Sequence, residues 1–382
     1  MSSGRFAVFL VIVLSVWTLL HLYLIWRIGT IPVVVRHLPR WTLIAIIVLL
    51  WLSYPLARYL SHAGVDSVAR TLEHIGADWI GVIFLLFVVL LVTDVITGFG
   101  LWLSRAAPTM RGWGLLAGCL LAVIGFVQGL RPPVVRDYEV TMPGLPAERN
   151  GTVLVAVSDL HLGSLLGEKW LAARIATIES LTPDLVVFAG DILEGDVRVD
   201  REFGPMVPIL RRLTPPLGVW AVTGNHEYYS GVEPCVHLLE SAGMQVLRDR
   251  WAEACPGLVV AGVDDLTARR QFARDGDPVG RALAGRPTDA ATIFISHTPW
   301  LADSAAHDGV GLMLSGHTHD GQIWPFGYFV QLTYPLMGGR YEIGTMPVIV
   351  CRGTGTWGPR LRLWRPSEIV RVVLRAPTDV GS

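Results

Sequence analysis

The sequence predicts an all-α membrane region followed by an α/β domain, and three observations lead to this fold class. Four long apolar runs occupy the first third of the 382 residues. After residue 150, short β-rich runs alternate with helical stretches, a pattern that gives layered α/β packing. Polar residues able to bind metal follow five of these short runs. We expect residues 1–131 to form the membrane region, 132–150 a linker and 151–382 the α/β domain.

The composition is too apolar for a single soluble domain. Hydrophobic residues make up 52% of the chain and charged residues 16%, and the mean hydropathy is +0.47. A helix that crosses a bilayer needs about 20 apolar residues, and four runs approach or exceed this length. These runs are Phe6 to Trp26, Trp41 to Tyr59, Trp79 to Leu103 and Trp113 to Leu130.

Two other interpretations of the apolar runs fit less well. Four runs without a charged face argue against a buried helical core. A cleaved signal peptide would have a shorter apolar stretch and an A-x-A-like site, and the first run has neither. We therefore expect four retained transmembrane helices. Gly114, Gly118 and Ala122 recur at every fourth position, which lets the last helix approach another closely.

Asp94 lies deep in the third run, where a carboxylate is costly unless it is paired. Such a residue is expected to face the interior of the helix bundle. His21 and Gln128 are its candidate partners. The sequence leaves open whether Asp94 has a function or only fixes the packing.

Charge and cysteine content exclude several classes of protein. A net charge of -1 argues against electrostatic capture of nucleic acid. The four cysteines are scattered and form neither a disulfide framework nor a metal-binding motif. No P-loop or catalytic serine motif occurs. The composition does not indicate an oligomeric state.

The expected elements of the α/β domain follow a stretch typical of a linker. Arg131-Pro132-Pro133 ends the last apolar run, and the residues up to Asn150 are polar and rich in Pro and Gly. The expected helices are Lys169 to Leu181, Arg201 to Leu213 and Pro234 to Ala242. The expected strands are Val153 to Val157, Leu185 to Ala189, Val219 to Val222, Leu258 to Val263, Thr292 to Ile295, Gly311 to Leu314, Arg340 to Gly344, Pro347 to Arg352 and Glu368 to Leu374.

Candidate metal ligands lie just after five of these strands. Strand ends in an open α/β sheet gather at one crevice, so the side chains should converge. Imidazole and carboxylate groups without thiolate favour Mn, Fe or Zn. Asp191 suits a bridging role between two ions, which indicates a two-metal hydrolase. The segments are Asp159-Leu160-His161, Gly190-Asp191, Gly224-Asn225-His226-Glu227, His297 and Gly316-His317-Thr318-His319.

In this order the segments follow the pattern D-x-H, G-D-x-x-D, G-N-H-[DE], H and G-H-x-H, which resembles the calcineurin-like metallophosphoesterase superfamily. The resemblance extends from about Asn150 to Arg375. It implies a four-layer αββα sandwich of two sheets between helices. Glu194 departs from the pattern, because the family has a second aspartate there, and this puts local hydrogen bonding in doubt.

The resemblance also implies the role of each site residue. Two divalent metal ions are expected, and Asp191 is shared between them. His226 takes the role of protonating the leaving oxygen or stabilising charge in the transition state. One ion is assigned to Asp159, His161 and His319, and the other to Asn225, His297 and His317.

We expect a metal-dependent phosphoesterase that hydrolyses a phosphodiester, phosphomonoester or pyrophosphate bond by attack of a metal-bound hydroxide. Trp324, Phe326, Tyr328 and Phe329 follow the last ligand closely and could dip into lipid, or could form a buried hairpin. With the membrane region, they favour a phospholipid or lipid-linked pyrophosphate. The alternatives are a soluble nucleotide phosphodiesterase and a membrane sensor that binds metal without turnover. The Gly353 to Gly358 run is a further candidate for phosphate binding, or a simple turn.

The side of the membrane that carries the α/β domain follows from the distribution of arginines. The two possible topologies tie at five arginines each. The first helix often dominates, and its carboxyl flank holds Arg27, Arg36 and Arg40 against Arg5 at its amino end. The first loop is therefore expected in the cytoplasm. Four spans then place the α/β domain of this multi-pass protein outside the cytoplasm.

Overall fold

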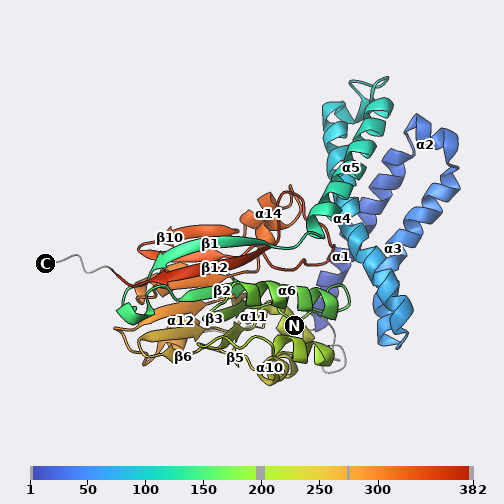
Figure 1. Ribbon diagram of the computed structural model, residues 1–382. Helices are drawn as coiled ribbons and strands as arrows, with labels where there is room; N and C mark the ends of the chain where they lie inside the picture. The colour runs from blue at the N-terminus through green and yellow to red at the C-terminus, as the bar shows by residue number, and fades with distance from the viewer. Residues whose placement is uncertain (1–2, 195–202, 273–275, 378–382) are drawn as a thin grey trace. The chain divides into compact units, whose positions relative to one another are not determined.

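The computed structural model describes residues 3–194, 203–272 and 276–377 (Figure 1). The chain divides into two compact units. The helical unit consists of Met1–Arg131 and Gly358–Trp364, and the α/β unit consists of Pro132–Trp357 and Arg365–Ser382. Each unit is described by itself.

The helical unit contains the four long apolar helices that the sequence predicts. Each is long and apolar enough to cross a membrane. The third helix was predicted to end at Leu103 but ends at Ile96, because Gly98 and Phe99 adopt positive φ angles of 57° and turn the chain. The helices are α1 (Ser3–Ile28), α2 (Pro32–His37), α3 (Arg40–His62), α4 (Asp66–Ile96), the 3-10 turn η1 (Gly98–Gly100) and α5 (Ala107–Gly129).

Small residues bring α5 close to α4. Gly114 and Gly118 are buried, and a side chain at position 118 would overlap Leu86 of α4. Their spacing predicts this close approach.

Asp94 pairs with two arginines and a tyrosine, so the predicted partners His21 and Gln128 are wrong. Its carboxylate lies 2.6 Å from Arg27 Nε and 2.9 Å from Arg111 Nε. The Tyr23 hydroxyl donates a hydrogen bond to Asp94 Oδ2 at 2.7 Å. Both arginines lie at the ends of apolar runs and resemble loop charges in the sequence, but the fold buries them.

The segment Gly358–Trp364 belongs to the helical unit, although the sequence predicts it as part of the α/β domain. Arg362 N donates to Gly125 O of α5 at 3.0 Å. Arg360 pairs with Asp78 of α4, where Nη2 lies 2.6 Å from Oδ2. Gln128 Oε1 accepts from Trp364 N at 2.7 Å. The segment is short and lacks an apolar run, so its composition carries no signal of this packing.

The α/β unit contains two six-stranded sheets. All nine strands predicted from the sequence are present, with bounds within two residues of those expected. The first sheet has the order β1 (Val134–Thr141), β12 (Glu368–Arg375), β2 (Val153–Val157), β3 (Leu185–Ala189), β4 (Val219–Val222) and β5 (Gln245–Val246). The second has the order β10 (Gly339–Ile343), β11 (Met346–Val350), β9 (Leu312–Ser315), β8 (Ala291–Ile295), β7 (Leu258–Gly262) and β6 (Arg250–Cys255).

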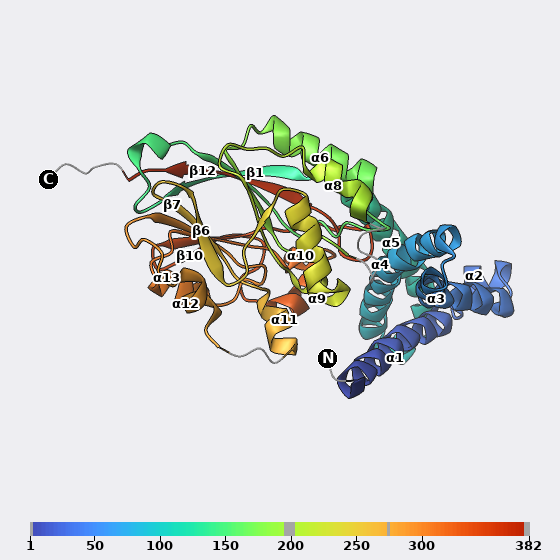
Figure 2. The same cartoon turned by 90° about the horizontal axis from the view of Figure 1, so that it is seen from below.

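Helices cover the outer face of each sheet, so the predicted four-layer αββα sandwich is confirmed. The two sheets pack on each other through the buried apolar residues of their inner faces. Figure 2 shows α6 and α8 over one outer face and α12 and α13 over the other. The covering helices are α6 (Glu168–Ser180), α8 (Val207–Leu210) and α10 (Val232–Ser241) on the first sheet and α11 (Leu266–Gln271), α12 (Pro278–Leu283) and α13 (Ala302–His307) on the second.

Two predicted elements differ from the structure. The expected linker 132–150 contains β1, which pairs in parallel with β12 from Val134 to Thr141. This strand lies at the edge of its sheet and is mostly exposed, so its polar composition hides it. The expected helix from Arg201 to Leu213 is shorter. Its described part holds the turn η3 (Gly204–Met206) and α8, and residues 201–202 lie outside the described residues.

Candidate metal centre

The predicted ligands all lie just after the carboxyl ends of β2, β3, β4, β8 and β9. Neighbouring strands β2, β3 and β4 run parallel in one sheet, and β8 and β9 run parallel in the other. The loops that follow them therefore meet at one end of the sandwich. Five site residues have positive φ angles, a strained conformation that concentrates at functional sites. They are Asp159, His161, Asp191, His317 and His319.

The structure brings six of the seven predicted ligands into two groups, and Asn225 belongs to neither group. In each group the ligand atoms lie within 4.8 Å of one another. Asp191 lies between the groups, since its Oδ2 is 3.1 Å from His297 Nε2 and 3.9 Å from His161 Nε2. The groups are Asp159, His161 and His319, and Asp191, His297 and His317.

The donor atoms of these groups fit divalent metal ions. His161 Nε2 and His319 Nε2 face each other at 3.0 Å, and His317 Nδ1 faces His297 Nε2 at 3.2 Å. Such pairs of nitrogens can share one proton or bind one cation. Asn225 Oδ1 is buried and accepts no hydrogen bond from the described residues. A buried orphan acceptor beside imidazoles and carboxylates is the environment expected for a cation.

The carboxylates of the site favour positive charge on two of the histidines. Burial lowers the pKa of His161, but Glu194 at 3.0 Å outweighs it and raises this pKa to about 9. Burial likewise opposes charge on His297, yet Asp191 raises its pKa well above the usual value. Burial and the neighbouring His297 instead lower the pKa of His317 to about 3. The site therefore stabilises cationic charge at its centre.

Glu194, the residue that departs from the family pattern, contacts the Nδ1 side of the His161 ring. One of its oxygens lies 3.0 Å from His161 Nδ1, so His161 Nε2 points toward Asp159 and His319. A carboxylate that holds the far nitrogen of a ligating histidine fixes both its orientation and its tautomer. The longer glutamate thus retains a carboxylate at the second nitrogen of the ring.

Glu227 is a site residue that the sequence analysis names within a motif but gives no role. Its buried carboxylate accepts four backbone N–H groups, from Asp191, Ile192, Leu193 and Gly224, at 2.7 to 3.1 Å. Burial and the nearby Asp191 raise the pKa of Glu227 to about 7, although the backbone hydrogen bonds act to lower it. Gly224 permits this packing, because a side chain there would overlap the Asp191 carboxylate. The final position of the G-N-H-[DE] pattern is the signal that marks Glu227.

His226 lies next to both ligand groups, with Nε2 4.0 Å from Asp191 Oδ2 and Nδ1 3.9 Å from Glu194. Its backbone N–H donates to Asp191 Oδ1 at 2.9 Å. Burial lowers the pKa of His226, and Asp191 opposes that shift. His161, Asp191 and His226 also form a possible ligand group. The geometry alone therefore permits either a ligand or an acid at this position.

The backbone of the Gly353 to Gly358 run is engaged in part by contacts within the protein. Thr354 N donates to Ser158 O at 2.8 Å, and Gly355 N donates to Asp159 O at 3.0 Å. Trp357 N donates to Gln322 Oε1 at 2.9 Å. Three of the six backbone N–H groups of this run are therefore satisfied within the protein, and phosphate binding by the run stays a prediction.

The aromatic segment after His319 is only partly buried. It continues through the turn η4 (His319–Gly321) into α14 (Gly327–Gln331). Phe329 is 63% exposed and Leu332 is 83% exposed, and Phe326 and Tyr328 are exposed as well. Trp324 is half-buried. The segment thus presents several apolar side chains on the surface of the α/β unit.

Comparison with known proteins agrees with this site. Residues 152–321 match the family described as "Calcineurin-like phosphoesterase". The "Transmembrane protein with metallophosphoesterase domain" of Danio rerio is 33% identical, over 86% of this chain and 80% of that protein. Its Bos taurus counterpart is 34% identical, over 72% of this chain and 64% of that protein. The "Uncharacterized metallophosphoesterase YkuE" of Bacillus subtilis is 29% identical, over 69% and 94%.

The chain belongs to the calcineurin-like phosphoesterase family. The predicted enzyme class, a hydrolase acting on phosphoester bonds, is confirmed at this level. The His and Asp residues of the chain form groups that could hold a metal ion.

Proposed function

We propose that the protein is a membrane-anchored phosphoesterase that holds two divalent metal ions and hydrolyses a phosphoester presented by the membrane, such as a lipid-linked substrate. The observation that carries the lipid preference is the exposed apolar surface of α14 and its flanks, which begins a few residues after His319. The four candidate spans support the anchoring. Exposed apolar patches beside a site are typical of lipid or protein contact.

In this proposal, Asp159, His161 and His319 hold one ion, Asn225, His297 and His317 hold the other, and Asp191 serves both. Mn, Fe or Zn suits these donors. When bound, the ions would polarise the phosphoryl oxygens and lower the pKa of a bound water.

The side chains around the ions have their own tasks in the hydrolysis. Water adds to phosphorus in line with the leaving group, and the bond from phosphorus to the leaving oxygen breaks. His226 protonates that oxygen or stabilises its charge, a contribution of about 10² to 10⁴ in rate. Glu194 keeps His161 in place, and Glu227 fixes the two loops that carry Asp191 and Asn225.

The lipid preference is tested by a double substitution, Phe329→Ser with Leu332→Ser. Both side chains are highly exposed, so their loss should not disturb the core. If both enter lipid, their loss should weaken capture of a lipid phosphoester in vesicles by more than about tenfold. Hydrolysis of a small soluble aryl phosphodiester should not change. Chelation should abolish both activities, and Mn should restore them.

The outcome separates the rival functions. If both substrates suffer equally, the substitution has damaged the fold. If neither suffers, α14 has no part in recognition and a soluble nucleotide becomes the better substrate. If no phosphoester is hydrolysed by the metal-loaded protein, a metal-binding membrane sensor is the better interpretation.

A further inference from the structure

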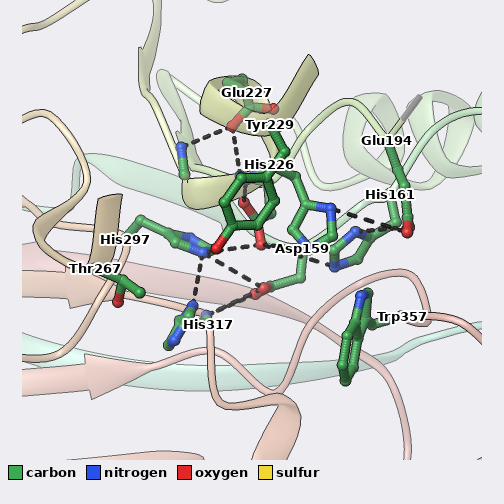
Figure 3. Close-up of polar contacts among 12 residues, drawn as sticks. Asp159, His161, Glu194, His226, Glu227, Tyr229, Thr267, His297, His317 and Trp357 are labelled. Atoms are coloured by element: carbon green, nitrogen blue, oxygen red, sulfur yellow. Dashed lines mark hydrogen bonds and ion pairs between the residues drawn. The ribbon is translucent and has the colours of Figure 1, made fainter. Parts of the chain in front are cut away.

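Tyr229 and Trp357 flank His226, and the hydrolysis described above gives neither a role. Their ring centroids lie 5.5 Å and 6.3 Å from that of His226, and Figure 3 shows the three rings together at the metal ligands. Tyr229 comes from α9 (Asn225–Ser230), and Trp357 follows β11 by seven residues. Tyr229 is 50% exposed and Trp357 is 51% exposed. Each ring therefore offers apolar surface to a molecule bound beside His226.

The backbone of Trp357 is fixed by Gln322. The Gln322 side chain accepts from Trp357 N at 2.9 Å and donates to Trp357 O at 3.0 Å. Gln322 is itself buried, and its backbone N–H donates to His319 O at 2.9 Å. One amide thus connects the turn that carries a predicted ligand to the backbone of an exposed tryptophan.

The chain just before Trp357 is fixed as well. Gly355 packs so closely on Leu160 that any side chain there would overlap the Leu160 carbonyl. A half-exposed indole on a backbone held this firmly is preorganised, and preorganisation is characteristic of binding residues.

We propose that Trp357 and Tyr229 contact the organic group whose oxygen leaves phosphorus, and that they select substrates in which this group is apolar or aromatic. The proposal rests on the proposed function, because it takes His226 to face the leaving oxygen. A group attached to that oxygen must lie within a few ångströms of the His226 ring, where the two aromatic faces are. Gln322 acts as a positioning residue through Trp357.

The alternative is that the two rings only hold His226 by edge-to-face packing. Aromatic pairs of this geometry do stabilise each other. In that case the nature of the organic group would make no difference. A test must therefore compare ligands that share one phosphorus group and differ in the organic group.

The test uses phenylphosphonate and methylphosphonate as probes on the full-length, Mn-loaded protein in detergent, with binding measured by calorimetry. The wild-type protein should bind phenylphosphonate more tightly. Trp357→Ala should weaken phenylphosphonate binding by about tenfold and leave methylphosphonate binding unchanged. Trp357→Phe should retain most of the discrimination. Gln322→Glu cannot donate to Trp357 O, so it should lose part of the discrimination while the variant still binds methylphosphonate.

Trp364→Ala is the matched control, since Trp364 is 52% exposed but belongs to the helical unit. It should leave the binding of both phosphonates unchanged. If Trp357→Ala weakens the binding of both phosphonates equally, the ring only packs against the site. If Trp357→Ala changes the binding of neither phosphonate, the ring contacts no ligand. Either result overturns the proposal. Discrimination without hydrolysis of any phosphoester would refute the proposed function alone, and failure of the wild-type protein to bind either probe would refute both.

Discussion

Glu227 shows how one residue determines the geometry of the whole centre. Its carboxylate accepts N–H groups from the loop that carries Asp191 and from the loop that carries Asn225. The candidate ligands could be predicted from the sequence because each is a metal-binding residue type just after an apolar strand. Glu227 and Gln322 contact backbone atoms instead, and residue types alone do not show which backbone groups a side chain contacts, even where a motif position marks the residue as it does for Glu227. Structure is needed to see them.

Replacing Glu227 with Gln should destabilise the α/β unit. The amide keeps the shape but has one acceptor oxygen and brings an NH₂ group against backbone donors. Buried N–H groups without an acceptor cost about 1 to 3 kcal/mol each, and at least one of the four should lose its partner. Thermal unfolding should show the loss, together with a lower metal content. Glu233→Gln is the control, because this exposed carboxylate pairs with Arg248 at the surface; an equal shift in both variants would contradict the role of Glu227.

Substitutions of Asp191 and of His226 should differ in their effect on metal content. Asp191→Ala deletes the carboxylate between the two ligand groups, so metal content and hydrolysis should both fall. His226→Ala should retain metal and reduce turnover by about 10² to 10⁴. Metal analysis of the purified variants, alongside hydrolysis of an aryl phosphodiester, distinguishes the two. Equal loss of metal from both would identify His226 as a ligand rather than an acid.

At the scale of elements, burial decides which parts of the fold the sequence reveals. The strand from Val153 to Val157 is uniformly apolar and buried, and its bounds are as predicted. The edge strand β1 is exposed and polar, so it resembles a linker. The packing of Gly358–Trp364 in the helical unit depends on single contacts such as Arg360 with Asp78. Contacts of that kind are set by the fold and have no periodicity to detect.

The Asp94 cluster joins α1, α4 and α5, and its loss should loosen the helical unit. Asp94→Asn leaves Arg27 and Arg111 buried without a negative partner. Breaking a buried ion pair in this way costs about 3 to 5 kcal/mol. The melting temperature in detergent should fall markedly. Asp66→Asn at the exposed start of α4 should change it little, and similar shifts in the two variants would mean that the cluster contributes no special stability.

At the scale of the whole molecule, two compact units share one chain that passes between them more than once. The apolar runs and the ligand order identified both units from the sequence. The return of Gly358–Trp364 to the helical unit could not be foreseen. The chain therefore connects the α/β unit to the helical unit at three places. These are after Arg131, before Gly358 and after Trp364. Truncation before Pro132 would therefore remove helices against which a later segment packs, and the full chain is the appropriate form for experiment.

The orientation of the chain in the membrane decides which substrates can reach the metal centre. We propose that the α/β unit lies outside the cytoplasm. Membrane insertion responds to the arginines of the unfolded chain, so Arg27 counts at that stage even though it later pairs with Asp94. With Arg36 and Arg40, it outweighs Arg5 across the first helix. Alkaline phosphatase fused after Arg136 should then be active and a fluorescent protein fused there should be dark, with the opposite pair of signals for fusions after Arg36. Active phosphatase after Arg36 and a bright fluorescent protein after Arg136 would place the centre in the cytoplasm and leave soluble nucleotides within its reach.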